Sequence, residues 1–153
     1  MIRLDTISTS EPTADQLAAL KAYASVVDSS QDALLTSLLK GAMLKVQRMV
    51  DCSLLVCTFE LVVTEKEDNG PVNLYQTIDL ITSVTDASGN NLQYTRVGNQ
   101  IFFDKQTDTC IIRYSTKVYA SDFSQYIPQV WQTAAAMYDG ESAQIIHQYL
   151  SQR

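Results

Sequence analysis

The sequence predicts an α+β fold in which an N-terminal helical hairpin and a C-terminal helix pack with a small antiparallel β-sheet inserted between them. Apolar residues recur at spacings of three and four over residues 13–51 and again over residues 127–150, which is the period of an α-helix. Residues 54–118 instead combine short β-prone runs with frequent turn signals, as antiparallel sheets do. A chain of 153 residues without a long linker is expected to form one domain with its own core.

A capping box marks the start of the first helix. Thr13 supplies an N-cap hydroxyl, and Gln16 follows three residues later, where its side chain can return to the backbone of the cap. Residues 28–30 then predict a tight turn and a second N-cap, so the two helices are expected to fold back as a hairpin. The apolar line of the first helix is Leu17, Leu20, Ala24 and Val27.

The second helix carries more apolar side chains than one helical face holds. A helix that is apolar on more than one side must be covered on more than one side, and this chain has few other helices to do so. We therefore expect a partner subunit to cover part of it. The main face comprises Leu35, Leu38, Leu39, Ala42, Val46, Met49 and Val50, and the candidates for a subunit interface off this face are Leu34, Met43 and Leu44.

The β-rich part is expected to begin with one hairpin, formed by residues 54–64 and 74–85 across a charged loop with an Asn-Gly turn signal. Turns at 86–91 and at Gly98-Asn99 separate the later strands. Those strands are predicted at 92–97, 101–103 and 110–118. Aromatic side chains on strands are expected to be core and cross-strand pairs, since a nucleic-acid stacking platform would need a more basic groove. They are Tyr75, Tyr94, Phe102, Phe103, Tyr114 and Tyr119.

The closing helix is expected to begin at Pro128, because a proline is tolerated where the helix needs no backbone N–H. Helical spacing continues through Val130 and Trp131 to Tyr138, where Asp139-Gly140 interrupts it. One or two further turns are expected before residue 150.

The composition limits the classes of function. Seventeen acidic against eleven basic residues give a formal net charge of −6, which argues against sequence-specific DNA binding through a basic face. No stretch approaches the roughly 18 apolar residues of a membrane span, and the first residues lack the apolar core of a signal peptide. Three cysteines, an odd number, also favour a reducing compartment. We expect an intracellular, soluble protein without a membrane partner.

Four features carry a resemblance to a known family: the turn at 28–35, the strand at 78–84 followed by Asp86-Ala87-Ser88-Gly89, the hairpin at 92–103, and the closing segment Ile127-Pro128-Gln129-Val130-Trp131. In order, spacing and turn chemistry they resemble the head-tail connector family of tailed phages and prophages, over nearly the whole chain. Members often leave the second helix through an aromatic residue, Thr and Gly. Here the exit reads Met49-Val50-Asp51-Cys52-Ser53, so its local geometry is expected to differ.

The resemblance implies a single connector-like domain and a structural virion protein that is not an enzyme and needs no catalytic residues, cofactor or metal. It implies a dodecameric ring beneath the portal that completes the DNA-filled head and presents the surface for tail attachment. The implied partners are further copies of the chain, the portal protein, a tail or tail-completion protein, and double-stranded DNA that passes without sequence-specific binding. The implied location is the virion, and the host cytoplasm during assembly.

Two alternatives stay open, a tail-completion or other virion adaptor protein and a small metal-binding module. Cys52, Cys57, Cys110 and His147 have the count of a Cys₃His zinc site. Residues 53–56, however, look like the entry to a strand and not like a polar zinc knuckle, so packed, reduced thiols are the favoured interpretation. His147 is also the only possible general base of a histidine-dependent triad, and an amphipathic terminal helix accounts for it without catalysis.

Glu65, Glu67 and Asp68 make the loop at 65–71 acidic. The loop lacks the alternating ligands and distal Glu of a calcium site. A ring through which DNA passes should present an acidic or neutral lumen, because each contact of Lys or Arg with phosphate adds affinity that slows passage. We therefore expect this loop to face the lumen or a partner, with a solvated hairpin tip as the alternative.

Overall fold

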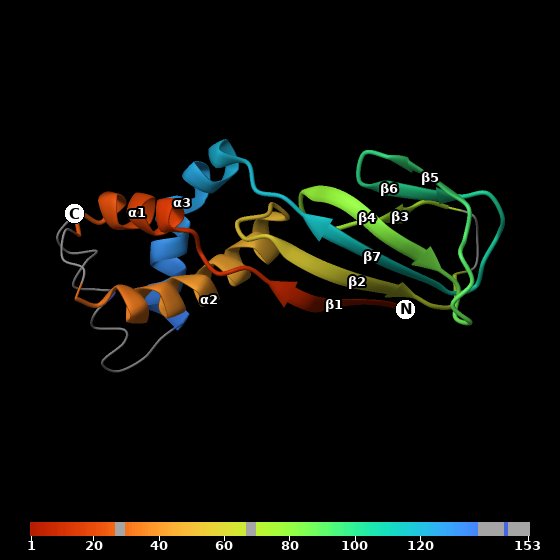
Figure 1. Ribbon diagram of the computed structural model, residues 1–153, viewed down its shortest axis with the longest axis horizontal. Helices are drawn as coiled ribbons and strands as arrows, with labels where there is room; N and C mark the ends of the chain where they lie inside the picture. Colours follow the sequence, from red (N-terminus) through yellow and green to blue (C-terminus); the bar gives the residue numbers. More distant parts are fainter. Residues whose placement is uncertain (27–29, 67–69, 138–145, 147–153) are drawn as a thin grey trace. The chain divides into compact units, whose positions relative to one another are not determined.

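The computed structural model describes residues 1–26, 30–66, 70–137 and 146 (Figure 1). The chain divides into two compact units. The β unit comprises Met1–Ser10 and Val56–Lys117, and the helical unit comprises Glu11–Leu55 and Val118–Arg153. Helices precede and follow most of the strands along the chain, so the predicted α+β class is confirmed.

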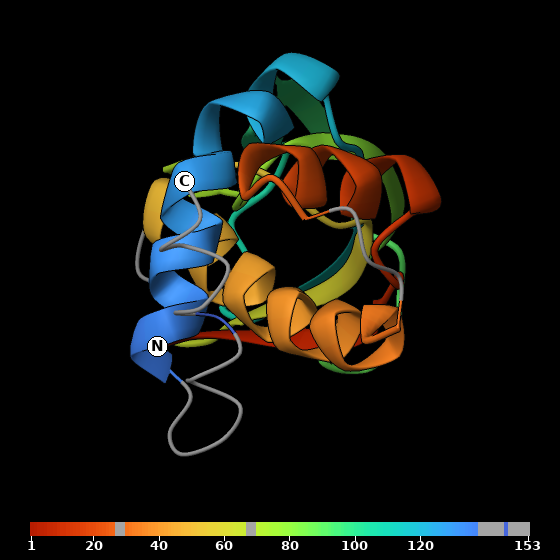
Figure 2. The ribbon, with the colours of Figure 1, turned by 90° about the vertical axis from the view of Figure 1, so that its left-hand side faces the viewer.

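The helical unit contains α1 (Ala14–Tyr23), α2 (Asp32–Val50) and α3 (Ala120–Met137). Figures 1 and 2 show that α3 runs across both α1 and α2. The predicted capping box is confirmed, since the Gln16 N–H donates to Thr13 Oγ1 at 3.1 Å and the Thr13 N–H donates to Gln16 Oε1 at 3.0 Å. No helix among the described residues is long and apolar enough to cross a membrane.

The second predicted N-cap is wrong in position. The residue that precedes α2 is Gln31, and its side chain makes no capping hydrogen bond. Asp28 and Ser29 lie outside the described residues. Asp32 in the first turn of α2 instead accepts a 2.6 Å hydrogen bond from Lys21 Nζ, so an ion pair from α1 holds this end of the helix.

Trp131 is the centre of the helical core. Its side chain is fully buried, and its Nε1–H donates to the carbonyl oxygen of Leu20 at 2.8 Å, which links α3 to the end of α1. The predicted main face of α2 is buried as far as Val46, whereas Met49 is exposed and Val50 partly exposed. The main buried side chains of the unit are Leu20, Leu35, Leu38, Leu39, Ala42, Met43, Val46, Leu54, Leu55, Phe123, Val130, Trp131 and Ala134.

The start of α3 differs from the prediction. The helix begins at Ala120, and Pro128 lies inside it instead of at its first position. A proline removes one backbone hydrogen bond and crowds the preceding turn, and the helix bends in its first half (Figure 2). Phe123 is buried seven residues before Val130, so its burial compensates for the lost bond and extends the helix upstream.

The β unit holds two antiparallel sheets. The four-stranded sheet has the order β1 (Ile2–Thr9), β2 (Cys57–Val63), β7 (Cys110–Thr116) and β4 (Ile78–Thr85). The three-stranded sheet has the order β3 (Val72–Asn73), β6 (Gln100–Phe103) and β5 (Tyr94–Val97). The two turns predicted at glycines are confirmed, because Gly89 and Gly98 have the positive φ values of 87° and 59° that favour glycine.

Strands β2 and β7 form the centre of the β core, because every second residue of each is buried. Phe59 lies opposite Tyr114 with the ring centroids 5.6 Å apart. The Tyr114 hydroxyl accepts from the Tyr75 N–H at 3.2 Å and donates to the Tyr75 carbonyl at 3.3 Å, so a buried ring fixes the segment before β4. The smaller sheet adds buried side chains of Val72, Ile101 and Phe103.

Two predictions about the strands are wrong. The first residues of the chain form β1, for which no strand was predicted, because the partner β2 lies about 50 residues further along the sequence. The predicted hairpin between residues 54–64 and 74–85 does not form, since β2 pairs with β1 and β7, while β4 pairs with β7. Long-range pairing decided both outcomes.

Candidate functional site

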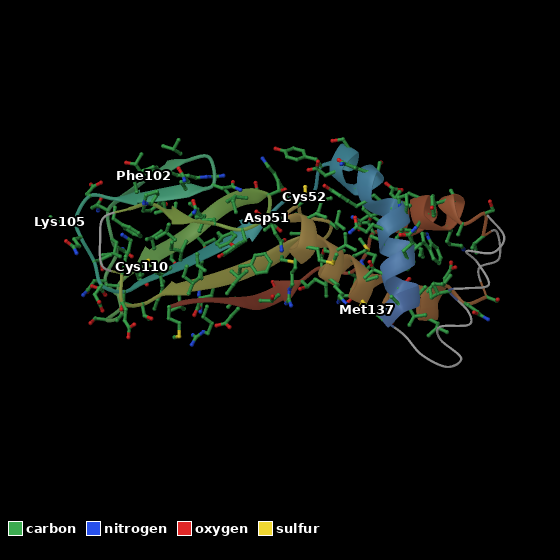
Figure 3. The ribbon with its side chains drawn as sticks, turned by 180° about the vertical axis from the view of Figure 1, so that it is seen from behind. Asp51, Cys52, Phe102, Lys105, Cys110 and Met137 are labelled. Carbon is green, nitrogen blue, oxygen red and sulfur yellow. The ribbon has the colours of Figure 1, made fainter. Side chains whose placement is uncertain are left out.

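The helical unit presents an apolar and cationic groove where the C-terminal half of α2 meets the end of α3. We call it the α2–α3 surface; Figure 3 labels Met137 on it. Met49 is 61% exposed and Met137 is 37% exposed, which is unusual for methionines beside a well-packed core. The groove has a volume of about 470 Å³, and its lining residues are Gly41, Leu44, Lys45, Arg48, Met49 and Met137.

The structure divides the three predicted interface residues. Leu34 is 39% exposed at the start of α2, and Leu44 is partly exposed in the groove. Met43 is completely buried in the core of the unit, so it is removed from the candidate set. Met49, placed on the core face by its spacing, is 61% exposed and lies on the surface instead.

The charges on this surface are unusual for the unit. The helical unit holds eight acidic and five basic residues. Lys21 and Lys40 form ion pairs with Asp32 and Glu11. Lys45 and Arg48 form none among the described residues, so two positive side chains flank the exposed methionines. Such a surface suits a partner that supplies apolar side chains and negative charge.

The β unit carries acidic side chains on the loops at one end. Val63, Thr85 and Cys110 are the strand ends that meet there, and Figure 3 labels Lys105 and Cys110 at this end. The Asp86 side chain accepts backbone hydrogen bonds from Asn90 and Ser88, both at 2.9 Å. These bonds, above all that from Asn90, lower the pKa of Asp86, so this carboxylate is negative at neutral pH. The described acidic residues of the loops are Glu65, Asp86, Asp104 and Asp108.

Of the predicted acidic cluster, only Glu65 lies among the described residues; Glu67 and Asp68 lie outside them. Glu65 is exposed and has a left-handed φ of 57°. Lys66 fixes the start of the loop, because its N–H donates to the Asp108 carbonyl at 2.9 Å and its ammonium lies 5.9 Å from the Phe103 ring centroid. The loop therefore connects the two sheets and is not the tip of the predicted hairpin.

The positions of the cysteines argue against a shared zinc site. Cys57 begins β2, whereas Cys110 lies opposite Val63 at the other end of that strand. Six residues of strand separate the two levels, about 20 Å at the usual rise per residue. Both thiols are buried, and burial raises the pKa of Cys110 although Lys66 acts in the opposite direction. The described residues contain no group of three or more metal-binding side chains, and His147 lies outside them.

The aromatic residues are divided between core and surface. Tyr114 and Phe103 are buried as predicted. Tyr75, Tyr94, Phe102 and Tyr119 are exposed by more than a third, so they are not core residues, although Tyr94 lies opposite Phe103 as a cross-strand pair. Tyr94 and Phe102 lie on the small sheet, whereas Tyr75 precedes β4 and Tyr119 immediately precedes α3 in the helical unit.

Comparison with solved structures relates the whole chain to components of phage-like particles. A chain from the neck of an empty gene transfer agent particle, computed with C6 symmetry, superposes with a TM-score of 0.67 and 15% identity, covering 96% of this chain and 94% of that chain. A chain from the virion of the native gene transfer agent particle gives 0.64 and 15%, covering 95% and 94%. A chain from the neck of the native particle, computed with C12 symmetry, gives 0.56 and 17%, covering 94% of each.

At these identities the likeness establishes a shared fold. No protein-family model and no curated protein matches the sequence. The shared fold extends over both units of the chain, since the covered fraction exceeds nine-tenths in each comparison.

Proposed function

We propose that this chain is a structural, non-enzymatic subunit of the neck of a phage or phage-like particle. The observation that carries the proposal is the full-length likeness to neck chains of gene transfer agent particles, which includes both the helical and the β unit. A short accidental match of a common motif would cover only one of them.

Within the neck, we place the chain in a ring beneath the portal that completes the DNA-filled head and receives the tail. The similar neck chains come from particles computed with C6 and C12 symmetry, and a twelve-membered ring contains both symmetries. Ring closure requires a head-to-tail interface in which one patch of a subunit meets a different patch of the next. The resemblance seen in the sequence implies the same arrangement.

The α2–α3 surface is our candidate for a contact with a protein partner in this assembly. Exposed Met49 and Met137 supply apolar area that adapts to different partners, and Lys45 and Arg48, which form no ion pair with another described residue, favour an acidic one. Leu34 and Leu44 extend the exposed apolar area of α2. A partner bound at this surface would cover apolar residues of α2 that the core of the unit leaves exposed.

The acidic loop end of the β unit is our candidate for the part that faces DNA or the tail. Negative side chains in a channel do not bind phosphates, so they let the double helix pass without retention. Asp86 keeps its charge to low pH because its pKa is lowered, and Glu65 is exposed on another loop of the same end.

Association with the portal tests the proposed function. The chain is mixed with the portal protein encoded in the same genome, and the complex is isolated by size-exclusion chromatography and imaged by electron microscopy. We expect a ring of this chain bound to the portal. Binding to a tail-completion protein but not to the portal would favour the adaptor alternative, and binding to neither would refute the neck assignment.

A charge reversal tests the acidic loop. Glu65, Glu67 and Asp68 are replaced together by Lys in the phage, and DNA retention, ejection and tail joining are measured. We expect a fold that is unchanged by circular dichroism and a loss of at least tenfold in infectious particles. The matched control replaces the same residues by Gln, Gln and Asn and should have a smaller effect. Normal plating of the Lys variant would show that the loop has no such role.

A further inference from the structure

The two sheets of the β unit end in four edge strands. These are β1 and β4 in the four-stranded sheet, and β3 and β5 in the three-stranded sheet. An edge strand presents N–H and C=O groups to which another strand can bind, unless the fold shortens, bends or covers that edge. The four edges of this chain differ in this respect.

Two of the edges are protected. The pairing of β4 with β7 is shifted twice, which bends β4. The segment after β4 then covers its end, because the Leu92 N–H donates to the Val84 carbonyl at 2.9 Å, and Arg96 Nη1 reaches the Asp79 carbonyl at 3.4 Å. Strand β3 has only two residues, too few to bind another strand well.

Strand β1 has a long open edge. The Thr64 N–H donates to the Met1 carbonyl at 2.9 Å, so this pair is hydrogen-bonded, and bonded pairs alternate with unbonded ones along an antiparallel ladder. Every second residue of β1 therefore turns its N–H and C=O away from β2, and the described part of the chain supplies no partner for them. The residues concerned, before the bulge at Ile7, are Ile2, Leu4 and Thr6.

Strand β5 has the second open edge. The Asp104 N–H donates to the Gln93 carbonyl at 3.2 Å, so the same alternation leaves Tyr94 and Arg96 with backbone groups that point away from β6. No described residue pairs with these groups. All four residues of β5 are exposed, and Val97 is 60% exposed, which matches the 59% of Ile2 on β1.

The two open edges lie on opposite sides of the β unit in both Figure 1 and Figure 3. We propose that β1 of one copy of this chain pairs with β5 of the next copy, so that a β layer continues from subunit to subunit. The inference rests on the proposed function, since it names the strands through which neck subunits meet.

A second copy is the occupant that these edges fit. When one edge of a copy pairs with the other edge of the next copy, the contact is head-to-tail. Contacts of this kind close into rings, such as assemblies with C6 or C12 symmetry. One contact satisfies both edges at once, and an unrelated strand would satisfy only one of them. The pairing would also bury the exposed apolar side chains beside each edge.

Disulfide trapping tests the contact directly. In a β1–β5 ladder, residues such as Arg3, Asp5 and Thr95 form the unbonded pairs, whose side chains are closest and whose Cα spacing suits a disulfide. Arg3→Cys with Thr95→Cys, and Asp5→Cys with Thr95→Cys, cover two registers. Cys52, which is partly exposed, is replaced by Ser in every variant. We expect a ladder of linked copies on a non-reducing gel after oxidation, up to the size of the ring.

Three controls make the ladder specific. Each single cysteine variant should give no ladder. Thr95→Cys combined with Thr82→Cys on the protected β4 edge should give none either. The variants are oxidised both in complex with the portal and alone at high concentration. The β1–β5 contact is therefore tested even if the chain does not bind the portal.

A proline variant provides an independent test. Thr6→Pro removes one outward N–H while it keeps the bonds of β1 to β2, and Thr6→Ala keeps that N–H. We expect Thr6→Pro to weaken self-association at least tenfold relative to Thr6→Ala, with similar melting temperatures. If no ladder forms in either register and the two variants assemble equally, the edge contact is wrong. If such a chain still forms a ring on the portal, the neck function stands without it.

Discussion

The two units of this chain reach a buried core by different means. The helical unit packs three helices around Trp131. Its indole N–H donates to the Leu20 carbonyl near the end of α1, and the buried Gln47 side chain accepts from two N–H groups only seven and eight residues further along the chain. The β unit depends on strands that come from two separate parts of the sequence, and two of its edges have no partner strand among the described residues.

This difference shows where each unit meets its partners. A helix satisfies its own backbone hydrogen bonds, so the helical unit offers side chains: exposed Met49 and Met137 beside Lys45 and Arg48. A sheet satisfies its backbone only where a neighbouring strand exists, so the β unit offers backbone groups as well as charge. We expect mutations in one unit to change the stability and the contacts of that unit more than those of the other.

The largest effect is expected from the centre of the helical unit. Trp131→Ala removes a fully buried side chain and one of the two donors to the Leu20 carbonyl, which keeps its bond from the Ala24 N–H. The cavity left by the indole should reduce the free energy of unfolding by about 3–5 kcal/mol. Trp131→Phe keeps much of the volume and should cost less. Urea unfolding followed by circular dichroism measures both, and equal stability of Trp131→Ala and the wild type would contradict the assigned core.

A smaller loss is expected from the buried Gln47 at the end of α2. Its Oε1 accepts hydrogen bonds from the N–H groups of Leu54 and Leu55, both at 3.1 Å. Gln47→Met keeps the length of the side chain but leaves two buried donors unpaired, so we expect a loss of about 2–3 kcal/mol. Ser37→Ala, at an exposed position of the same helix, is the control and should change stability little.

In the β unit, Tyr114→Phe removes one hydroxyl and both of its bonds to the Tyr75 backbone while the ring contact with Phe59 remains. The expected loss is about 1–2 kcal/mol. Trp131 is the only tryptophan, so its fluorescence reports the helical unit, whereas circular dichroism reports both units. If the unfolding midpoint falls by circular dichroism but not by fluorescence, the two units unfold separately. If neither midpoint changes, the Tyr114 hydroxyl bonds do not stabilise the fold.

The smallest expected effect is the titration of Cys110. Burial raises the pKa of this thiol, so the folded state holds its proton at a pH where the unfolded chain has begun to lose it. The resulting stability is complete below the ordinary thiol pKa and is lost as pH rises through the raised value. Between about pH 8 and pH 10, the wild type should therefore lose stability more steeply than Cys110→Ala. Parallel pH profiles would show that the thiol does not contribute.

Local signals in the sequence were sufficient for several features. The capping box of Thr13 and Gln16, the turns at Gly89 and Gly98, and the helical period of α2 each depend on residues within one or two turns of one another. Their geometry follows from local hydrogen bonding and φ preferences. The pattern of α2 also showed that this helix carries more apolar side chains than one buried face can hold.

Contacts between distant segments decided the rest. β1 needs a partner 50 residues away, the start of α3 depends on the burial of Phe123, and spacing alone could not show that Met43 is buried while Met49 is exposed. The period of a helix gives the direction of each side chain, but only the packing of the other elements determines which directions are covered. The open edges of β1 and β5 likewise arise from strand order, which no single segment of the sequence contains.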